Sequence, residues 1–124
     1  MIDSSCWIKF FRNSDKQISD LVQELIESDH AAISGMIELE LFQGIKSEKQ
    51  SFEIKELFSV LKYFDSNREV YINAGIKIRE FRKKGISIAP SDAIIAEICL
   101  SNNIRLLTTD SDFENFKGLQ ILKL

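Results

Sequence analysis

Short strand-like runs alternate with longer helical stripes along this chain, and this alternation restricts the possible folds more than any other feature. We expect strands at 1–3, 31–34, 104–108 and 119–122, while 60–65 fits either a helix end or a brief strand. Short strands that alternate with helices are typical of a parallel sheet sandwiched between helices. The alternative is an all-helical bundle, but 104–108 and 119–122 are too short for helices and are bounded by turn residues. The pattern therefore predicts an α/β fold.

Four segments carry helical periodicity, with apolar residues three and four positions apart. They are the stripe Ile18, Leu21, Val22, Leu25 and Ile26; the stripe Ile54, Leu57, Phe58 and Leu61; the stripe Tyr71, Ala74, Ile78 and Phe81, which should stop at Gly85; and a largely buried segment that begins near Ser91 and Asp92 and runs towards Asn102. The sequence has a single proline and shows no repeat or linker, so we expect residues 1–124 to form one domain.

Composition excludes several classes of protein. A net charge of −3 argues against broad binding of nucleic acid through bulk charge, although it does not exclude a nuclease. The two cysteines lie far apart and form no zinc-binding spacing, and such low cysteine usage fits a reducing compartment. The start of the sequence lacks the pattern of a signal peptide, and no apolar run reaches the length of a membrane span. The expected location is the cytoplasm, with no membrane association.

Three groups of acidic residues stand at the boundaries of the expected elements. Asp3 closes the first strand, Asp92 opens the buried helix, and Asp110 follows the strand at 104–108, with Asp112 two residues later. Ligands of parallel α/β sheets bind beyond the carboxyl ends of the strands, where these side chains can converge. For each aspartate the alternative is a structural role as a helix N-cap.

Glu40 is a further candidate because it lies inside the apolar segment 36–42. On a helix its neighbours would be Met36, Ile37 and Gly44, and a carboxylate in such surroundings needs a partner. Glu38 would point about 200° away around the same helix, so the two glutamates cannot share one site. We favour Glu40 as the site residue and expect Glu38 to face solvent.

The chemistry of such a cluster can be derived from its residue types. Carboxylates that lie together repel one another unless a cation is bound, and oxygen ligands suit hard cations such as Mg²⁺ or Mn²⁺. The only histidine, His30, cannot provide a two-histidine nuclease mechanism. A divalent ion held by carboxylates can activate water and orient a phosphodiester. The acids therefore indicate phosphoryl-transfer chemistry, without identifying the substrate.

Four motifs together resemble the PIN-domain nucleases, and most closely the VapC-type toxins of bacterial and archaeal toxin–antitoxin pairs. The motifs are Asp3-Ser4-Ser5, Glu40-Leu41-Phe42-Gln43-Gly44, Ser91-Asp92-Ala93-Ile94-Ile95-Ala96 and Thr108-Thr109-Asp110-Ser111-Asp112-Phe113. They follow the family's order and span nearly the whole chain.

The resemblance implies a three-layer α/β/α Rossmann-like fold with a central parallel sheet, and Mg²⁺- or Mn²⁺-dependent endonuclease cleavage of RNA. It implies a catalytic quartet of Asp3, Glu40, Asp92 and Asp110, with all four as metal ligands. Asp112 would be an accessory acid and a further metal ligand in the same pocket, and Ser5 and Thr108 would be hydroxyl residues that order it. It also implies a homodimer that is inhibited by a cognate antitoxin protein.

Two residues depart from the family pattern. Ser4 stands where threonine is commoner, and Glu97 follows the Ile-Ala pair where a small residue is frequent. Neither change removes a carboxylate of the quartet, but Glu97 suggests different local packing.

The densest basic run is Lys77, Arg79, Arg82, Lys83 and Lys84. These residues could contact RNA phosphates. We favour a solvated helix face instead, because cations near a helix C-terminus complement its dipole.

Two other functions remain as alternatives. A PIN fold could serve as an inactive binding module, although such a protein would usually have lost one or more of the four acids. A receiver-type phospho-acceptor domain would need paired acids near the first strand, but only Asp3 lies there. Asp65 could act as its acceptor, yet no Lys-Pro pair follows 104–108.

Overall fold

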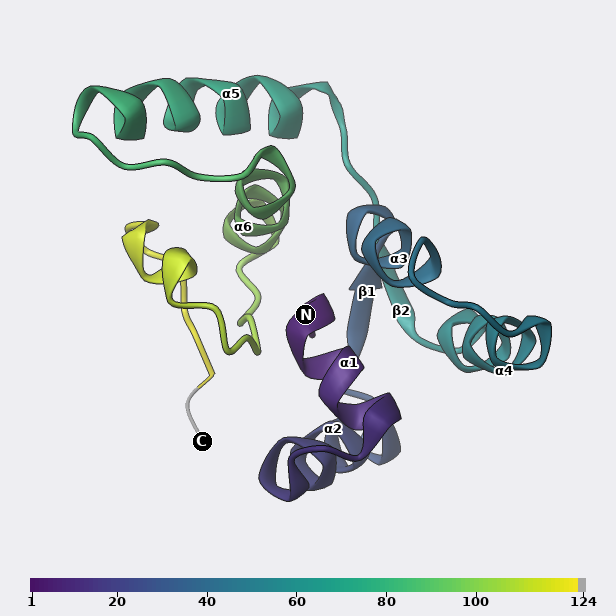
Figure 1. Cartoon of the computed structure of the whole chain (residues 1–124). Helices are drawn as coiled ribbons and strands as arrows, with labels where there is room; N and C mark the ends of the chain where they lie inside the picture. The colour runs from purple at the N-terminus through teal and green to yellow at the C-terminus, as the bar shows by residue number, and fades with distance from the viewer. Residues whose placement is uncertain (123–124) are drawn as a thin grey trace.

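The computed structural model describes residues 1–122, which form helices around short parallel strands (Figure 1). The elements are α1 (Ser4–Arg12), α2 (Lys16–Glu27), β1 (Ala32–Ser34), α3 (Gly35–Phe42), α4 (Glu48–Ser59), β2 (Lys62–Phe64), α5 (Arg68–Lys83), α6 (Pro90–Asn102) and the 3-10 helix η1 (Ser111–Asn115). In Figure 1, α5 packs over α6 at one end of the view, and α1 packs on α2 at the other. The predicted α/β fold is confirmed, and the all-helical alternative is wrong.

The sheet is parallel and its order differs from the order of the chain. β1 pairs with β2 in parallel, with Ile33 opposite Tyr63. On the other side of β1, the Ile2 amide donates a hydrogen bond to the Ala32 carbonyl. Parallel bridges then join Ile2 to Leu107 and Leu106 to Ile121. The spatial order is therefore β2, β1, the first segment, the segment around Leu107 and the segment around Ile121, which is the doubly wound order.

The strands are shorter than the sequence suggested. The segments at 1–3, 104–108 and 119–122 make single bridges rather than extended ladders, whereas 60–65 contains the true strand β2. Each pairing is brief, so the sheet depends on packing as well as on its hydrogen bonds. Its central residues Ile2, Ile33 and Leu106 are at most 1% exposed.

All four helices predicted from periodicity are present, as α2, α4, α5 and α6. One residue of the third stripe was assigned wrongly, because Tyr71 is 54% exposed while Ala74 is buried. Tyr71 lies in the first turn of α5, where its neighbour Val70, only 4% exposed, faces the core instead. The chain leaves this helix through Gly85, whose φ of 77° is readily adopted only by glycine.

Helix α1 was not predicted from the sequence. Its residues 7–11 are rich in aromatic and β-branched side chains, which are only moderate helix formers. Packing stabilises the helix instead: Trp7 is fully buried, and its ring lies 5.6 Å from Phe11 and 4.9 Å from Phe58 of α4. This aromatic cluster fixes the direction in which the chain leaves Asp3.

Over residues 1–122, no helix is both long enough and apolar enough to cross a membrane.

Candidate metal centre

The carboxyl ends of the first segment and of the Leu107 segment lie side by side. Ile2 pairs with Leu107, and the Asp3 amide donates to the Leu107 carbonyl at 2.9 Å. The chain winds from the first segment towards β2 on one side, and later returns to place Leu107 on the other side. Asp3 and Thr108 therefore stand at the point where the winding reverses, which is the usual ligand site of doubly wound sheets.

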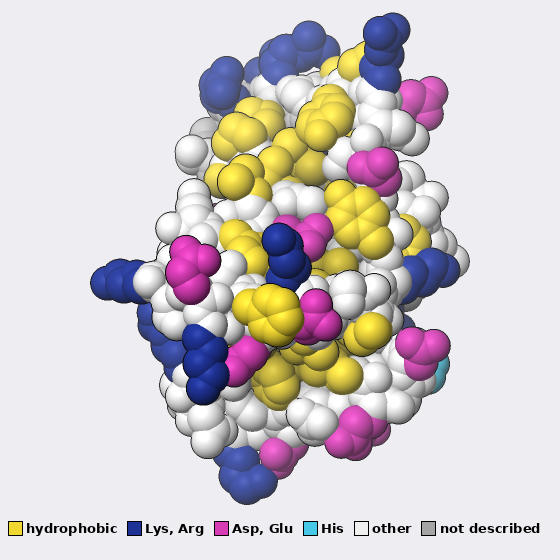
Figure 2. Space-filling model, turned by 90° about the vertical axis from the view of Figure 1, so that its right-hand side faces the viewer, with side chains coloured by type: hydrophobic (Ala, Val, Ile, Leu, Met, Phe, Trp, Pro, Cys, Tyr) yellow, Lys and Arg dark blue, Asp and Glu magenta, His cyan; other side chains and the backbone are white. Residues whose placement is uncertain are grey.

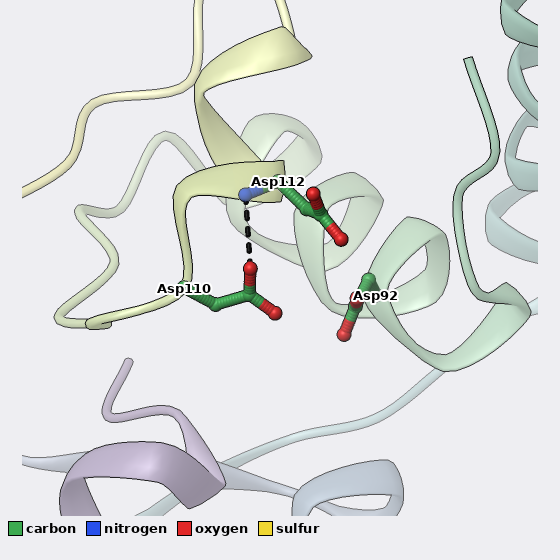
Figure 3. Close-up of side chains that lie close together, drawn as sticks. All are labelled: Asp92, Asp110 and Asp112. Carbon is green, nitrogen blue, oxygen red and sulfur yellow. Dashed lines mark hydrogen bonds between the residues drawn. The ribbon is translucent and has the colours of Figure 1, made fainter.

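Three carboxylates converge next to this point. One oxygen from each of Asp92, Asp110 and Asp112 lies within 4.8 Å of the other two (Figure 3). Asp92 is in the first turn of α6, Asp110 precedes η1, and Asp112 lies within η1. Figure 3 shows the three side chains turned towards a common space between α6 and η1.

Asp3 lies near enough to this group for its charge to act on Asp92, and it is only 4% exposed. Its Oδ2 accepts hydrogen bonds from Thr108 Oγ1 at 2.8 Å and from Ser5 Oγ at 3.0 Å. Thr108 Oγ1 in turn accepts a bond from the Asp110 amide at 3.0 Å. The two hydroxyl residues predicted to order the pocket thus contact Asp3, and Thr108 links it to Asp110.

Glu40 approaches from α3 and is half-buried. Its Oε1 accepts a hydrogen bond from Ser4 Oγ at 3.4 Å. Burial, and then the nearby charge of Asp3, raises the pKa of Glu40, while the Ser4 hydroxyl lowers it. Asp3 and Glu40 lie beside the three clustered aspartates without joining the 4.8 Å group. The contact of Ser4 with Glu40 was not predicted from the sequence, although Ser4 stands within the Asp3 motif.

Glu38 lies away from the acids, as predicted, but it does not face open solvent. It is partly buried, and this burial raises its pKa. Its charge acts on Tyr63 of β2, whose phenolic oxygen accepts a hydrogen bond from the Gly35 amide. A side-chain Cβ at Gly35 would come within 2.8 Å of that oxygen, so this close approach requires glycine.

The electrostatics of Asp92 reflect the crowding of like charges. Its pKa is raised to about 6, chiefly by burial, then by Asp110, and further by Asp3, Glu40 and Asp112. The other four acids predicted for the site therefore all act on Asp92. An arrangement of this kind stores repulsion that a bound cation would relieve.

The three aspartates differ in whether they cap a helix. Asp92 is not an N-cap, because α6 begins after Ala89 with Pro90 in its first turn. Asp3 occupies the N-cap position of α1, but its carboxylate makes no capping hydrogen bond. Asp110 does cap η1, accepting from the Asp112 amide at 2.9 Å. Capping thus accounts for the carboxylate of Asp110 and for neither of the other two.

A cavity of about 820 Å³ lies elsewhere, lined by Leu21 and Leu25 of α2 together with Asp29, Arg105 and Leu122. Of the described residues that line it, none is one of the five acids. The cavity is therefore separate from the acidic site.

Fold and site together define a class: doubly wound parallel α/β domains with a carboxylate cluster at the reversal point of the sheet. The chain belongs to the PIN domain family, whose model matches residues 1–119. The family resemblance predicted from the four motifs is confirmed.

Solved structures of similar fold agree with this assignment. VapBC-1 from nontypeable Haemophilus influenzae is 26% identical, with a TM-score of 0.80 over 98% of this chain and 95% of the matched chain. DNA-bound VapBC from Salmonella typhimurium is 24% identical, with the same TM-score and coverage. VapBC2 from Rickettsia felis, bound to a promoter DNA fragment, is 20% identical at a TM-score of 0.80, over 98% of this chain and 96% of that one. No curated protein sequence matched this chain significantly.

Proposed function

We propose that this chain is a Mg²⁺- or Mn²⁺-dependent endoribonuclease and acts as the toxin of a toxin–antitoxin pair. The observation that carries the proposal is the convergence of Asp92, Asp110 and Asp112 within 4.8 Å, with Asp3 and Glu40 beside them. PIN domains of the VapC type are generally nucleases, and this chain retains every acid that such a site needs.

The donor set fits a hard divalent cation. The candidate ligands Asp3, Glu40, Asp92, Asp110 and Asp112 offer only carboxylate oxygens, which suit Mg²⁺ or Mn²⁺ better than softer metals. A bound ion would supply an activated water and neutralise charge on the phosphodiester.

The surrounding residues have distinct tasks in this proposal. Ser5 and Thr108 hold the Asp3 carboxylate through its Oδ2, which leaves its charge intact. Ser4 orients Glu40 from the other side. Because these donors are neutral hydroxyls, the cluster keeps the negative charge that attracts a cation.

Cleavage of RNA by the purified protein tests the proposal. We expect cleavage with Mg²⁺ or Mn²⁺, none with EDTA, and a large loss in Asp92→Asn. Asp29→Asn is the matched control, since it makes the same chemical change at a residue lining the separate cavity, and asparagine tolerates the φ of 61° found there. Equal cleavage by wild type and Asp92→Asn, or cleavage that persists in EDTA, would contradict the proposal.

The toxin role is supported by the similar structures, which are VapBC complexes and, from Klebsiella pneumoniae, a toxin–antitoxin complex. We expect a cognate antitoxin protein to bind and inhibit this chain. Expression should be toxic, and Asp3→Ala should abolish the toxicity. An equally toxic Asp3→Ala variant would separate the toxicity from the acidic site.

We also propose that the chain forms a homodimer through an apolar patch, which we define as Tyr63, Tyr71 and Ile72. These side chains are 51–54% exposed. Tyr71 lies close enough to Tyr63 to contribute to the raised pKa of that side chain. Figure 2 shows hydrophobic side chains gathered on one face of the molecule. Light scattering should report a dimer that Ile72→Glu weakens, and a monomeric wild type would contradict the proposal.

A further inference from the structure

A second buried carboxylate lies outside the acidic site. Glu97 of α6 is 5% exposed, although it is charged and stands where the PIN resemblance predicts a small residue. Its partner is Lys77 of α5, with which it forms an ion pair. The Lys77 side chain is 32% exposed, so the pair lies at the edge of the α5–α6 interface with the glutamate inside.

Lys77 also contacts the segment that follows the clustered aspartates. Its ammonium lies 5.9 Å from the ring centroid of Phe116, directly after η1. Phe116 packs edge-on against Phe81 of α5 at 5.1 Å and lies 6.3 Å from Phe113 of η1. One lysine therefore joins α5, α6 and the end of η1.

These same elements carry the three carboxylates. Asp92 is five residues before Glu97 on α6, about 7.5 Å along the helix axis. Asp112 is on η1, four residues before Phe116. The carboxylates drive α6 and η1 apart, whereas Lys77 attracts both: Glu97 through charge and Phe116 through a cation–π contact.

We infer that Lys77 and Glu97 are positioning residues that hold α6 against η1 and so preorganise the acidic cluster for a divalent cation. The inference rests on the proposed function. It also changes the interpretation of the basic run: Lys77 is neither an ordinary solvated cation nor free to bind RNA phosphate.

The test is titration of the protein with Mn²⁺ by calorimetry, at a temperature where circular dichroism shows every variant folded. Lys77→Met should weaken Mn²⁺ binding about tenfold or more, the size of effect seen when groups that orient metal ligands are removed. Lys77→Arg should stay within about threefold of wild type, since a guanidinium can make both contacts. The matched control is Lys49→Met, which removes the lysine of an exposed pair with Glu53 on α4 and should leave Mn²⁺ affinity unchanged.

Glu97→Gln provides a second route if Lys77→Met does not fold. The variant keeps the side-chain shape, and Lys77 is exposed enough to reach water, so we expect it to fold and to bind Mn²⁺ at least threefold more weakly. With RNA, both variants should need more Mn²⁺ for half-maximal cleavage but approach the wild-type rate at saturation.

The outcomes separate this inference from the proposed function. Wild-type Mn²⁺ affinity in Glu97→Gln or in folded Lys77→Met would overturn the positioning role and leave the nuclease proposal standing. A wild-type protein that binds no Mn²⁺ would overturn both.

Discussion

Asp3 and Glu97 are both buried carboxylates, and the protein accommodates them in opposite ways. At the carboxyl edge of the sheet, the hydroxyls of Ser5 and Thr108 satisfy Asp3 without cancelling its charge. At the α5–α6 interface, the ammonium of Lys77 neutralises Glu97. Burying a charge is costly in either case, so the choice of partner is informative. Neutral partners preserve a charge for a ligand, whereas a charged partner uses it to join two helices.

The largest expected effect is on RNA cleavage, when one carboxylate of the acidic site loses its charge. We expect Asp110→Asn to lower RNA cleavage about a thousandfold, equivalent to about 4 kcal/mol of transition-state stabilisation. The fold should be retained, because asparagine can still cap η1. Steady-state cleavage and thermal melting, compared side by side, check both parts. An Asp110→Asn variant with a lowered melting temperature and wild-type cleavage would contradict this prediction.

The α5–α6 interface should respond in stability instead. Lys77→Met leaves Glu97 buried without its partner, and we expect a loss of about 3 kcal/mol in the free energy of unfolding. Glu97→Gln should cost only about 1 kcal/mol, because the partly exposed lysine can reach water. Urea denaturation measures both values. Equal losses in the two variants would contradict this prediction, because they would mean that an unpaired Lys77 is as costly as an unpaired Glu97.

The hydroxyls around Asp3 should have an intermediate effect on activity. Thr108→Val removes the bond to Asp3 Oδ2 and the acceptor for the Asp110 amide, while it keeps the side-chain shape. We expect cleavage to fall roughly tenfold, as is usual when a partner of a metal ligand is lost. Thr109→Val is the neighbouring control, since Thr109 is exposed and its side chain makes no contact within this network. No difference between the two variants would remove Thr108 from the proposed site.

The smallest effect should be the pH dependence of the metal-free protein. The pKa of Asp92 is about 6 in the fold, above its ordinary value of 3.8. Between these two pH values the folded protein therefore retains a proton that the unfolded chain has released. Asp92 therefore destabilises the fold progressively as the pH rises from about 4 to 6, and remains destabilising above that. Asp92→Asn should be more stable than wild type at pH 7.5, and this advantage should shrink towards pH 4. Urea midpoints in EDTA check the trend, which an advantage independent of pH would refute.

The sequence predicted the helices whose apolar stripes face the core and the parallel character of the sheet. It did not predict α1, because Trp7 and its aromatic partners stabilise that helix through contacts with residues far away in sequence. The lengths of the strands could not be predicted from the sequence either, because single bridges and extended ladders have the same apolar pattern.

The candidate site, too, was predicted only in part from the sequence. The order of the motifs and the positions of the strand ends identified Asp3, Asp92 and Asp110 as candidate site residues. In the structure they lie at the carboxyl edge of the sheet. Their catalytic roles stay predictions. In the sequence, Lys77 could not be distinguished from the other basic residues of its helix. The reason is that its ion pair with Glu97 joins two different helices and leaves no sign in the residue pattern. The extent of the domain and the cytoplasmic location also stay predictions.

The hydrogen bond between Thr108 and Asp3 joins residues 105 positions apart in the chain. During synthesis Asp3 emerges together with Ser5, but Thr108 joins it only once the Leu107 segment has emerged, and Asp110 and Asp112 come later still. A ribosome-bound intermediate that lacks these residues has neither the Thr108 hydroxyl that contacts Asp3 nor the three-carboxylate group. We therefore expect the nascent protein to be inert towards RNA, including that of the ribosome making it, until the chain has emerged beyond Asp112.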